Sequence, residues 1–236
     1  MSETINVVDE QQKKLNETEI VVVLDRSGSM GSIQDSTVKG FNTFILEQKN
    51  SDGEAFVTLV QFDHEYNMNY KSVPIKEVQD LIVGETYIPR GYTALLDAIG
   101  KTIEELETDR DVVFVIITDG EENQSRTYKA DAIKKIIETH ENEKGWKFVF
   151  MGANQNAITT ANTYGISGNN ALTYAADNEH VTMAYASVGS NIKSFRSAKS
   201  ALYTETLSRG FAASAAEMDS LKDDLSFSDE QRNETI

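Results

Sequence analysis

Residues 19–30 read Glu-Ile-Val-Val-Val-Leu-Asp-Arg-Ser-Gly-Ser-Met. The five apolar residues in a row are typical of a buried strand. Three small polar residues follow where that strand would end: Asp25, Ser27 and Ser29. A second apolar run, 112–117, leads to Asp119 in the same way. Open α/β sheets bind ligands at the carboxyl ends of their strands, so these polar residues form a candidate site.

Strand-like and helix-like patterns alternate along the chain. Apolar runs predict strands at 19–25, 55–62, 112–117, 147–151 and 171–174, and a neighbouring strand with more polar content is predicted at 66–73. Helical spacing of apolar residues predicts helices at 32–49, from Thr93, around 128–137, at 154–164 and from about Asp177, with a short helical piece at 76–82. This alternation predicts an α/β fold with a doubly wound, mostly parallel sheet flanked by helices.

The side chains at the candidate site indicate a metal ion. Two carboxylates (Asp25 and Asp119) and three hydroxyls (Ser27, Ser29 and Thr93) are hard oxygen donors, with no His or Cys nearby. Such a set suits Mg²⁺ best, and Mn²⁺ or Ca²⁺ as alternatives. Mg²⁺ favours six oxygen ligands and takes few protein carboxylates, which leaves a position for an oxygen from outside the chain.

The pattern Asp25-x-Ser27-x-Ser29, then Thr93, then Asp119 resembles the metal-ion-dependent adhesion site (MIDAS) of the von Willebrand factor A family. The resemblance extends from about residue 19 to 207. It implies a Rossmann-like sheet of six strands with one antiparallel edge strand, 66–73. It also implies a bound Mg²⁺ whose open position accepts an Asp or Glu carboxylate of a partner protein.

Four neighbours of these residues are candidate contacts for such a partner. Arg26 could meet an acidic partner or form a local salt bridge, and Tyr92 stands where many relatives have a second glycine. Glu121 and Glu122 could repel acidic partners or assist the local field. They could instead favour the start of the next helix through its dipole, which is our preferred interpretation.

The chain has 236 residues, 39% of them apolar, so a single domain at 19–208 can bury a full core. The net charge of −16 and the pI near 4.6 argue against a nucleic-acid partner. Cysteine is absent, so disulfides and thiolate metal sites are excluded. No segment is apolar enough to insert into a membrane, and Met1 to Thr18 form a polar arm without a signal sequence, so we expect a cytoplasmic protein.

The segment 209–236 is acidic. Disorder is one expectation for it. Alternatively, four apolar residues could form one helical face that docks on the domain or on a partner: Phe211, Met218, Leu221 and Leu225.

These patterns predict a non-enzymatic, Mg²⁺-dependent protein-binding module. A hydrolase is the weaker alternative, because Gly28-Ser29-Met30-Gly31 has Ser27 where a nucleophile elbow requires glycine, and His64, His140 and His180 lie outside the polar loops. The chain also resembles compact stand-alone bacterial and phage members of the family. That resemblance implies either an adaptor for an intracellular partner such as an ATPase, or a structural component of a phage or other large particle, which would be virion-associated.

Overall fold

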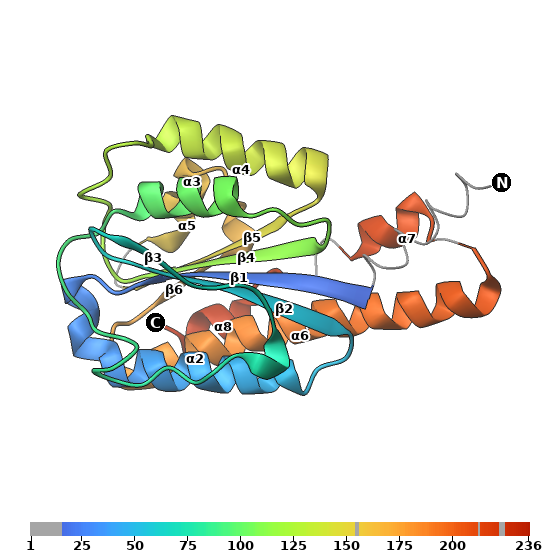
Figure 1. Cartoon of the computed structure of the whole chain (residues 1–236), viewed down its shortest axis with the longest axis horizontal. Coiled ribbons are helices and arrows are strands. Elements are labelled where there is room, and N and C mark those ends of the chain that lie inside the picture. The colour runs from blue at the N-terminus through green and yellow to red at the C-terminus, as the bar shows by residue number, and fades with distance from the viewer. Residues whose placement is uncertain (1–15, 154–155, 212, 222–224) are drawn as a thin grey trace.

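The computed structural model of the chain describes residues 16–153, 156–211, 213–221 and 225–236. Its centre is a six-stranded sheet in the order β3-β2-β1-β4-β5-β6 (Figure 1). The strands are β1 (Glu17–Asp25), β2 (Glu54–Phe62), β3 (Tyr66–Pro74), β4 (Asp111–Thr118), β5 (Lys147–Ala153) and β6 (Ala171–Tyr174). All neighbouring pairs are parallel except β2 and β3, which confirms the predicted antiparallel edge strand.

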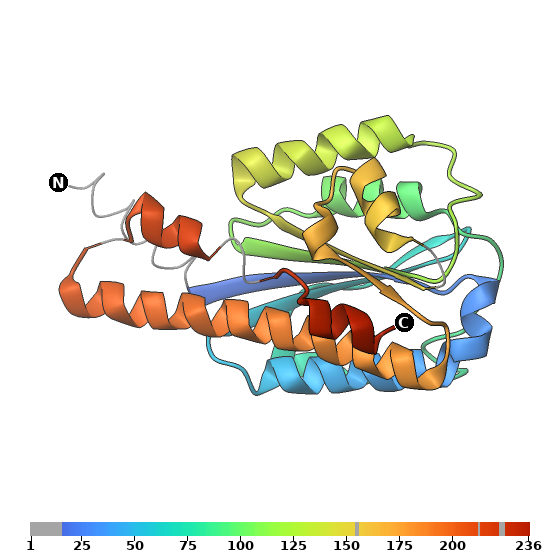
Figure 2. The same ribbon diagram turned by 180° about the vertical axis from the view of Figure 1, so that it is seen from behind.

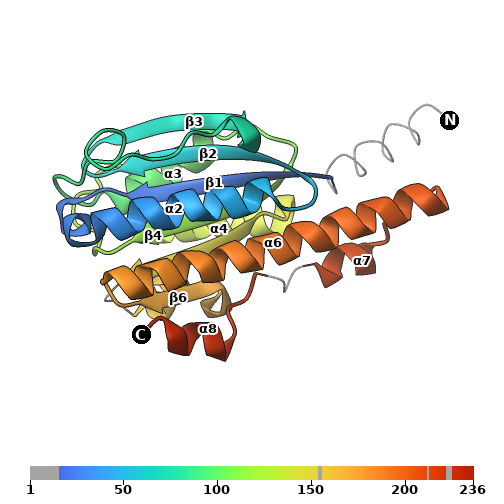
Figure 3. The ribbon, with the colours of Figure 1, turned by 90° about the horizontal axis from the view of Figure 1, so that it is seen from below.

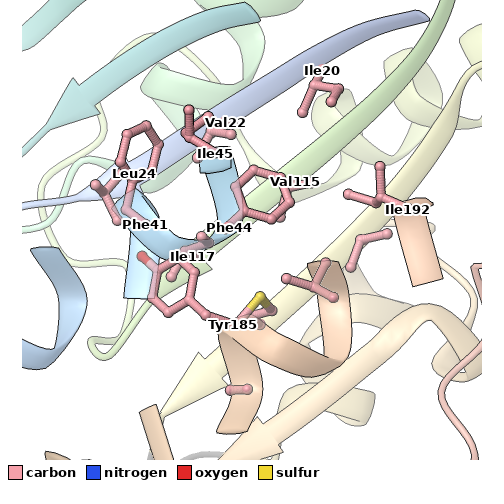
Figure 4. Packing of buried hydrophobic residues seen from close by; sticks show 14 of the residues in the cluster. Ile20, Val22, Leu24, Phe41, Phe44, Ile45, Val115, Ile117, Tyr185 and Ile192 are labelled. Carbon is pink, nitrogen blue, oxygen red and sulfur yellow. The ribbon is translucent and has the colours of Figure 1, made fainter. Parts of the chain in front are cut away.

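Helices cover both faces of the sheet. Those on one face are α3 (Leu95–Glu105), α4 (Ala130–Lys144) and α5 (Ala157–Thr163), and those on the other are α2 (Gln34–Lys49) and α6 (Asn178–Arg209) (Figures 1 and 2). Alternate residues of the central strands point to opposite faces. On β1, Ile20, Val22 and Leu24 therefore pack against α2 and α6, while Val21 and Val23 pack under α3 and α4. Figure 4 shows Phe41, Phe44 and Tyr185 closing the first of these cores.

The helix expected at 32–49 is observed as α2, and the residues just before it form a 3-10 helix, η1 (Gly28–Ile33). The helix expected from Thr93 begins at Leu95, and Asp177 caps α6 as predicted, accepting hydrogen bonds from the amides of Glu179 and His180. The predicted helix at 154–164 is observed as α5, and residues 154–155 lie outside the described part of the chain.

The prediction of a short helix at 76–82 was wrong. Only η2 (Ile75–Glu77) is helical there, and the chain continues as an irregular strap. Val78 and Leu81, three residues apart, both point into the core, so the spacing of the apolar residues resembles that of a helix. The strap does not need helical hydrogen bonds, since Asn42 bonds both the amide and the carbonyl of Leu81 and Lys49 donates to the carbonyl of Val78.

The ends of the chain add to this frame. β1 begins at Glu17, two residues before the predicted domain start, and residues 1–15 of the predicted arm lie outside the described residues. At the other end, α7 (Ala215–Ser220) and α8 (Asp229–Glu234) follow α6 (Figure 3). The segment's buried apolar residues are Leu221, Leu225 and Phe227, whereas Phe211 is exposed. Thr235 bonds the backbone of β6 and of the residue after it, so this segment packs along the β6 edge.

No helix in the described part of the chain is both long and apolar enough to cross a membrane.

Candidate metal centre

Parallel pairing of β1 and β4 brings the two predicted aspartates together. Leu24 lies opposite Ile117 in the register, so Asp25 and the residues after Thr118 leave the sheet side by side. Ser27 and Ser29 follow Asp25 into η1, and Asp119 begins the loop after β4. Thr93 reaches the same edge from the loop before α3. The structure therefore gathers all five predicted site residues at the carboxyl ends of the central strands.

The hydroxyls converge on the space above Gly120. Ser27 Oγ lies 3.1 Å from Ser29 Oγ, which donates a 2.6 Å hydrogen bond to Asp119 Oδ1. A Cβ atom placed on Gly120 would lie 3.1 Å from Thr93 Oγ1, 3.5 Å from Ser29 Oγ and 3.8 Å from Ser27 Oγ. Because residue 120 has no side chain, three hydroxyl oxygens and a carboxylate face one small space.

Asp25 is fully buried beneath this group. Its Oδ1 accepts the amide of Ser27 at 2.6 Å, and its Oδ2 accepts the hydroxyl of Thr118 at 2.6 Å. Burial raises the pKa of Asp25 to about 6, although the hydrogen bonds from Thr118 and Ser27 oppose this rise. Burial also raises the pKa of Asp119. Both shifts mark negative charge that is short of a compensating positive charge.

Backbone bonds fasten the two loops that carry Ser27, Ser29 and Thr93. The amide of Arg90 donates to the carbonyl of Arg26 at 2.8 Å, and the amide of Gly28 donates to the carbonyl of Gly91 at 3.2 Å. Gly91 has φ of +68°, and a Cβ there would strike the His64 ring at 2.1 Å, so this position requires glycine.

Hydrogen bonds made by its backbone amide and carbonyl hold Thr93 in place. Its amide donates to Asn123 Oδ1 at 3.0 Å, and its carbonyl accepts the amides of Asn123 and Gln124. The next residue, Ala94, donates its amide to the carbonyl of Asp63. The position of the Thr93 hydroxyl is thus fixed by two neighbouring loops, one that carries Asn123 and Gln124 and one that carries Asp63.

Two buried tyrosines that sequence analysis did not single out support the aspartate-bearing strand ends. Tyr87 donates its hydroxyl to the carbonyl of Asp25 at 2.6 Å, and Tyr174 lies 3.5 Å from the carbonyl of Thr118. Neither tyrosine carries a local signal, because each meets the strand end from a distant part of the chain. Asp63 was also missed as a support of the site. It could have been found, because it directly follows β2, as Asp25 ends β1.

The four candidate partner contacts differ in their surroundings. Arg26 is largely buried and pairs with Asp63 at 3.1 Å, while Tyr92 is 64% exposed beside Thr93. Glu121 is exposed at the rim. The prediction that Glu122 favours the start of the next helix was wrong. Its carboxylate accepts the amide of Leu96 at 2.9 Å and so caps α3, the helix before it in the chain.

The donor chemistry of this cluster fits a small divalent cation. In the described ranges, no Lys, Arg or His forms an ion pair with Asp25 or Asp119, and no group of three or more His, Asp or Glu could by itself bind a metal. A cation here would therefore depend on hydroxyl ligands beside two carboxylates, the hard-oxygen set that suits Mg²⁺.

A family model, described as the von Willebrand factor type A domain, matches residues 19–188. No curated protein matches the chain by sequence.

Solved structures share the fold. They include proximal thread matrix protein 1 from the mussel byssus with a zinc-occupied MIDAS motif (TM-score 0.55, 16% identity, 74% of this chain and 47% of that one). A second is the ArnB paralog VWA2 from Sulfolobus acidocaldarius, with a TM-score of 0.52 and 15% identity over 75% of this chain and 45% of that one. A third is a von Willebrand factor type A protein from Catenulispora acidiphila, with a TM-score of 0.52 and 12% identity over 78% of this chain and 43% of that one. This chain covers less than half of each of these solved chains.

Proposed function

We propose that this chain, which belongs to the von Willebrand factor type A domain family, is a non-enzymatic module that holds Mg²⁺ and through it binds a carboxylate of a partner protein. The observation that carries the proposal is the convergence of three hydroxyls and Asp119 on the space above Gly120, over the buried Asp25. Charge and donor type both call for a small hard cation there.

Each residue has a definable task. Ser27, Ser29, Thr93 and Asp119 would hold the cation, and Asp25 would supply charge from below while fixing the Ser27 amide. A bound divalent cation supplies an open coordination position for an Asp or Glu carboxylate of the partner. Because such a contact is largely desolvated, one acidic residue could dominate the binding energy of the interface.

The environment of the serines supports binding rather than catalysis. Ser29 donates to the carboxylate of Asp119, and Ser27 contacts the hydroxyl of Ser29 and donates its amide to Asp25. His64 pairs with Asp63, His140 with the backbone of α4 and His180 with Asp177, so within the described residues no histidine is bonded to either serine. A nucleophilic mechanism would require such a base.

The first test is direct metal titration, followed by a pull-down from the lysate of the source organism in Mg²⁺ and in EDTA. The variants are Asp25→Ala and, as a control, Asp131→Asn, which alters an exposed carboxylate on α4. We expect wild type and the control to bind Mg²⁺ and to capture a partner only with Mg²⁺ present. Asp25→Ala should do neither while keeping its far-UV circular dichroism.

A partner that is retained in EDTA and by the Asp25→Ala variant would contradict metal-bridged binding. It would instead place the contact on another face of the domain.

A further inference from the structure

A hollow of about 420 Å³ lies next to the metal centre, and none of the five proposed metal-site residues lines it. It is bordered by the β2–β3 hairpin, by α3 and by the loop that leads to α4. Ala94 lines it, and Ala94 directly follows Thr93. A ligand that reaches the metal centre could therefore place a neighbouring side chain in this hollow.

Its wall contains both aromatic rings and carboxylates. The rings belong to Phe62, Tyr66 and Tyr128. Tyr66 donates its hydroxyl to Glu105 Oε2 at 3.2 Å, and Tyr128 hydrogen-bonds Glu104. The Tyr128 ring lies against Gly100, where a Cβ would come within 2.6 Å, so no larger residue fits beneath it. The rings are thus preorganised, with carboxylates at their edges.

The other acidic residues of the wall are already engaged. Asp97 accepts the amides of Arg126, Thr127 and Tyr128, and Glu65 pairs with Arg90. Glu104 and Glu105 instead contact tyrosine hydroxyls, and Glu105 also meets the ammonium of Lys101, so a cationic ligand would meet these two carboxylates.

The chain itself places a cation in the hollow. Lys101 Nζ lies 4.2 Å from the centre of the Tyr66 ring and 3.7 Å from Glu105 Oε1. The Lys101 side chain is half exposed, so it can move aside. An ammonium over an aromatic face, next to a carboxylate, is the geometry by which proteins recognise basic side chains.

We propose that this hollow binds an Arg or Lys side chain of the partner protein, with Lys101 as the occupant in the unbound state. The proposal rests on the proposed function, because the partner's acidic residue would be held at the metal centre while its basic residue enters the hollow. The recognised surface would then be a neighbouring acidic and basic pair rather than a lone carboxylate.

The test uses the full chain in EDTA with arginine amide or lysine amide as the probe, and follows the Tyr66 and Tyr128 ring signals by NMR. We expect saturable shifts that glutamine amide at matched ionic strength does not produce. Glu104→Gln combined with Glu105→Gln should weaken the probe about threefold or more, as expected for losing the charge beside a cation–π contact. Lys101→Met should tighten binding, because it removes the internal competitor.

The matched control is Glu107→Gln, an exposed carboxylate on the same side of the domain that does not line the hollow. Shifts that do not saturate, or that are unchanged in both the double variant and Lys101→Met, would overturn the proposal. Because EDTA is present throughout, this result is independent of the metal titration that tests the proposed function.

Discussion

Strand β1 carries a buried carboxylate near each end, and only one of the two is paired with a positive charge from the chain. Glu19, at the amino end of the sheet, is fully buried and accepts hydrogen bonds from Thr58, Ser72 and Arg110. Asp25, at the carboxyl end, is equally buried but meets only amides and hydroxyls, with a second carboxylate, Asp119, nearby.

The amino end is supplied with positive charge by the chain. Arg110 pairs with Glu19 at 3.2 Å and with Glu17 at 2.9 Å. Lys199, from the long helix α6, is almost wholly buried and pairs with Asp111 at 2.9 Å. A buried carboxylate that is paired with a cation of the same chain has a structural role. At the carboxyl end of β1, by contrast, no cationic side chain of the described residues pairs with Asp25, so the positive charge would come from a bound ligand. This contrast can be tested by removing one group at a time.

The largest effect should follow from Arg110→Met, which keeps much of the side-chain volume but leaves Glu19 without its cation. We expect the free energy of unfolding to fall by about 3 kcal/mol, because a buried charge loses its partner. The measurement is urea unfolding in EDTA, and metal affinity should not change. Asp25→Asn, by contrast, removes an uncompensated charge, so it should unfold within about 1 kcal/mol of wild type. Equal destabilisation by both variants would refute the contrast.

Gly120→Ala should affect the metal centre alone. The new methyl would lie 3.1 to 3.8 Å from three hydroxyl oxygens, in the space where a cation would be held. Gly120 has no left-handed backbone angle, so alanine adds no backbone strain. We expect Mg²⁺ or Mn²⁺ binding to weaken by about 2 kcal/mol, roughly thirtyfold. Isothermal titration measures it, with Gly31→Ala as the control, since that Cβ meets only Pro89 at 4.0 Å.

Metal binding should depend on pH through Asp25. The pKa of this carboxyl rises from 3.8 to about 6 in the metal-free fold, so the folded state binds the proton more tightly than the unfolded chain does. Stability in EDTA should therefore decrease as pH rises from about 4 to 6. A cation competes with the same proton, so metal affinity should fall about tenfold per pH unit below 6 and level off above it.

Metal titrations between pH 5 and 8 measure this effect. A flat profile would mean that Asp25 does not contribute its charge to the site.

The smallest effect should come from Tyr87→Phe, which removes the hydrogen bond to the carbonyl of Asp25. We expect metal affinity to fall by about 1 kcal/mol, roughly fivefold, because the strand end is less firmly placed. Tyr185→Phe is the matched control, since this neighbouring buried hydroxyl has no hydrogen-bond partner among the residues that the structure describes. An equal loss in both variants would indicate a general packing effect.

Local patterns were sufficient for much of the fold. Apolar runs located the buried strands, because such a strand needs side chains that are apolar on both faces. The edge strand β3 is more polar and is only partly buried along its length. The strap after β3 shows where such patterns fail, since Val78 and Leu81 have helical spacing but satisfy their backbone through Asn42 and Lys49, which lie on α2. A neighbouring helix can thus replace local hydrogen bonds.

The sequence by itself determined which polar residues leave the central strands, because an apolar run shows where a parallel strand ends and such ends share one edge of the sheet. Asp25, Ser27, Ser29 and Asp119 could therefore be grouped before any coordinates. Only the tertiary structure decided how charge is distributed around them. The pairing of Glu19 with Arg110 and the bond from Tyr87 to Asp25 join positions 91 and 62 residues apart. Such contacts are set by packing of the whole domain, and no local periodicity records them.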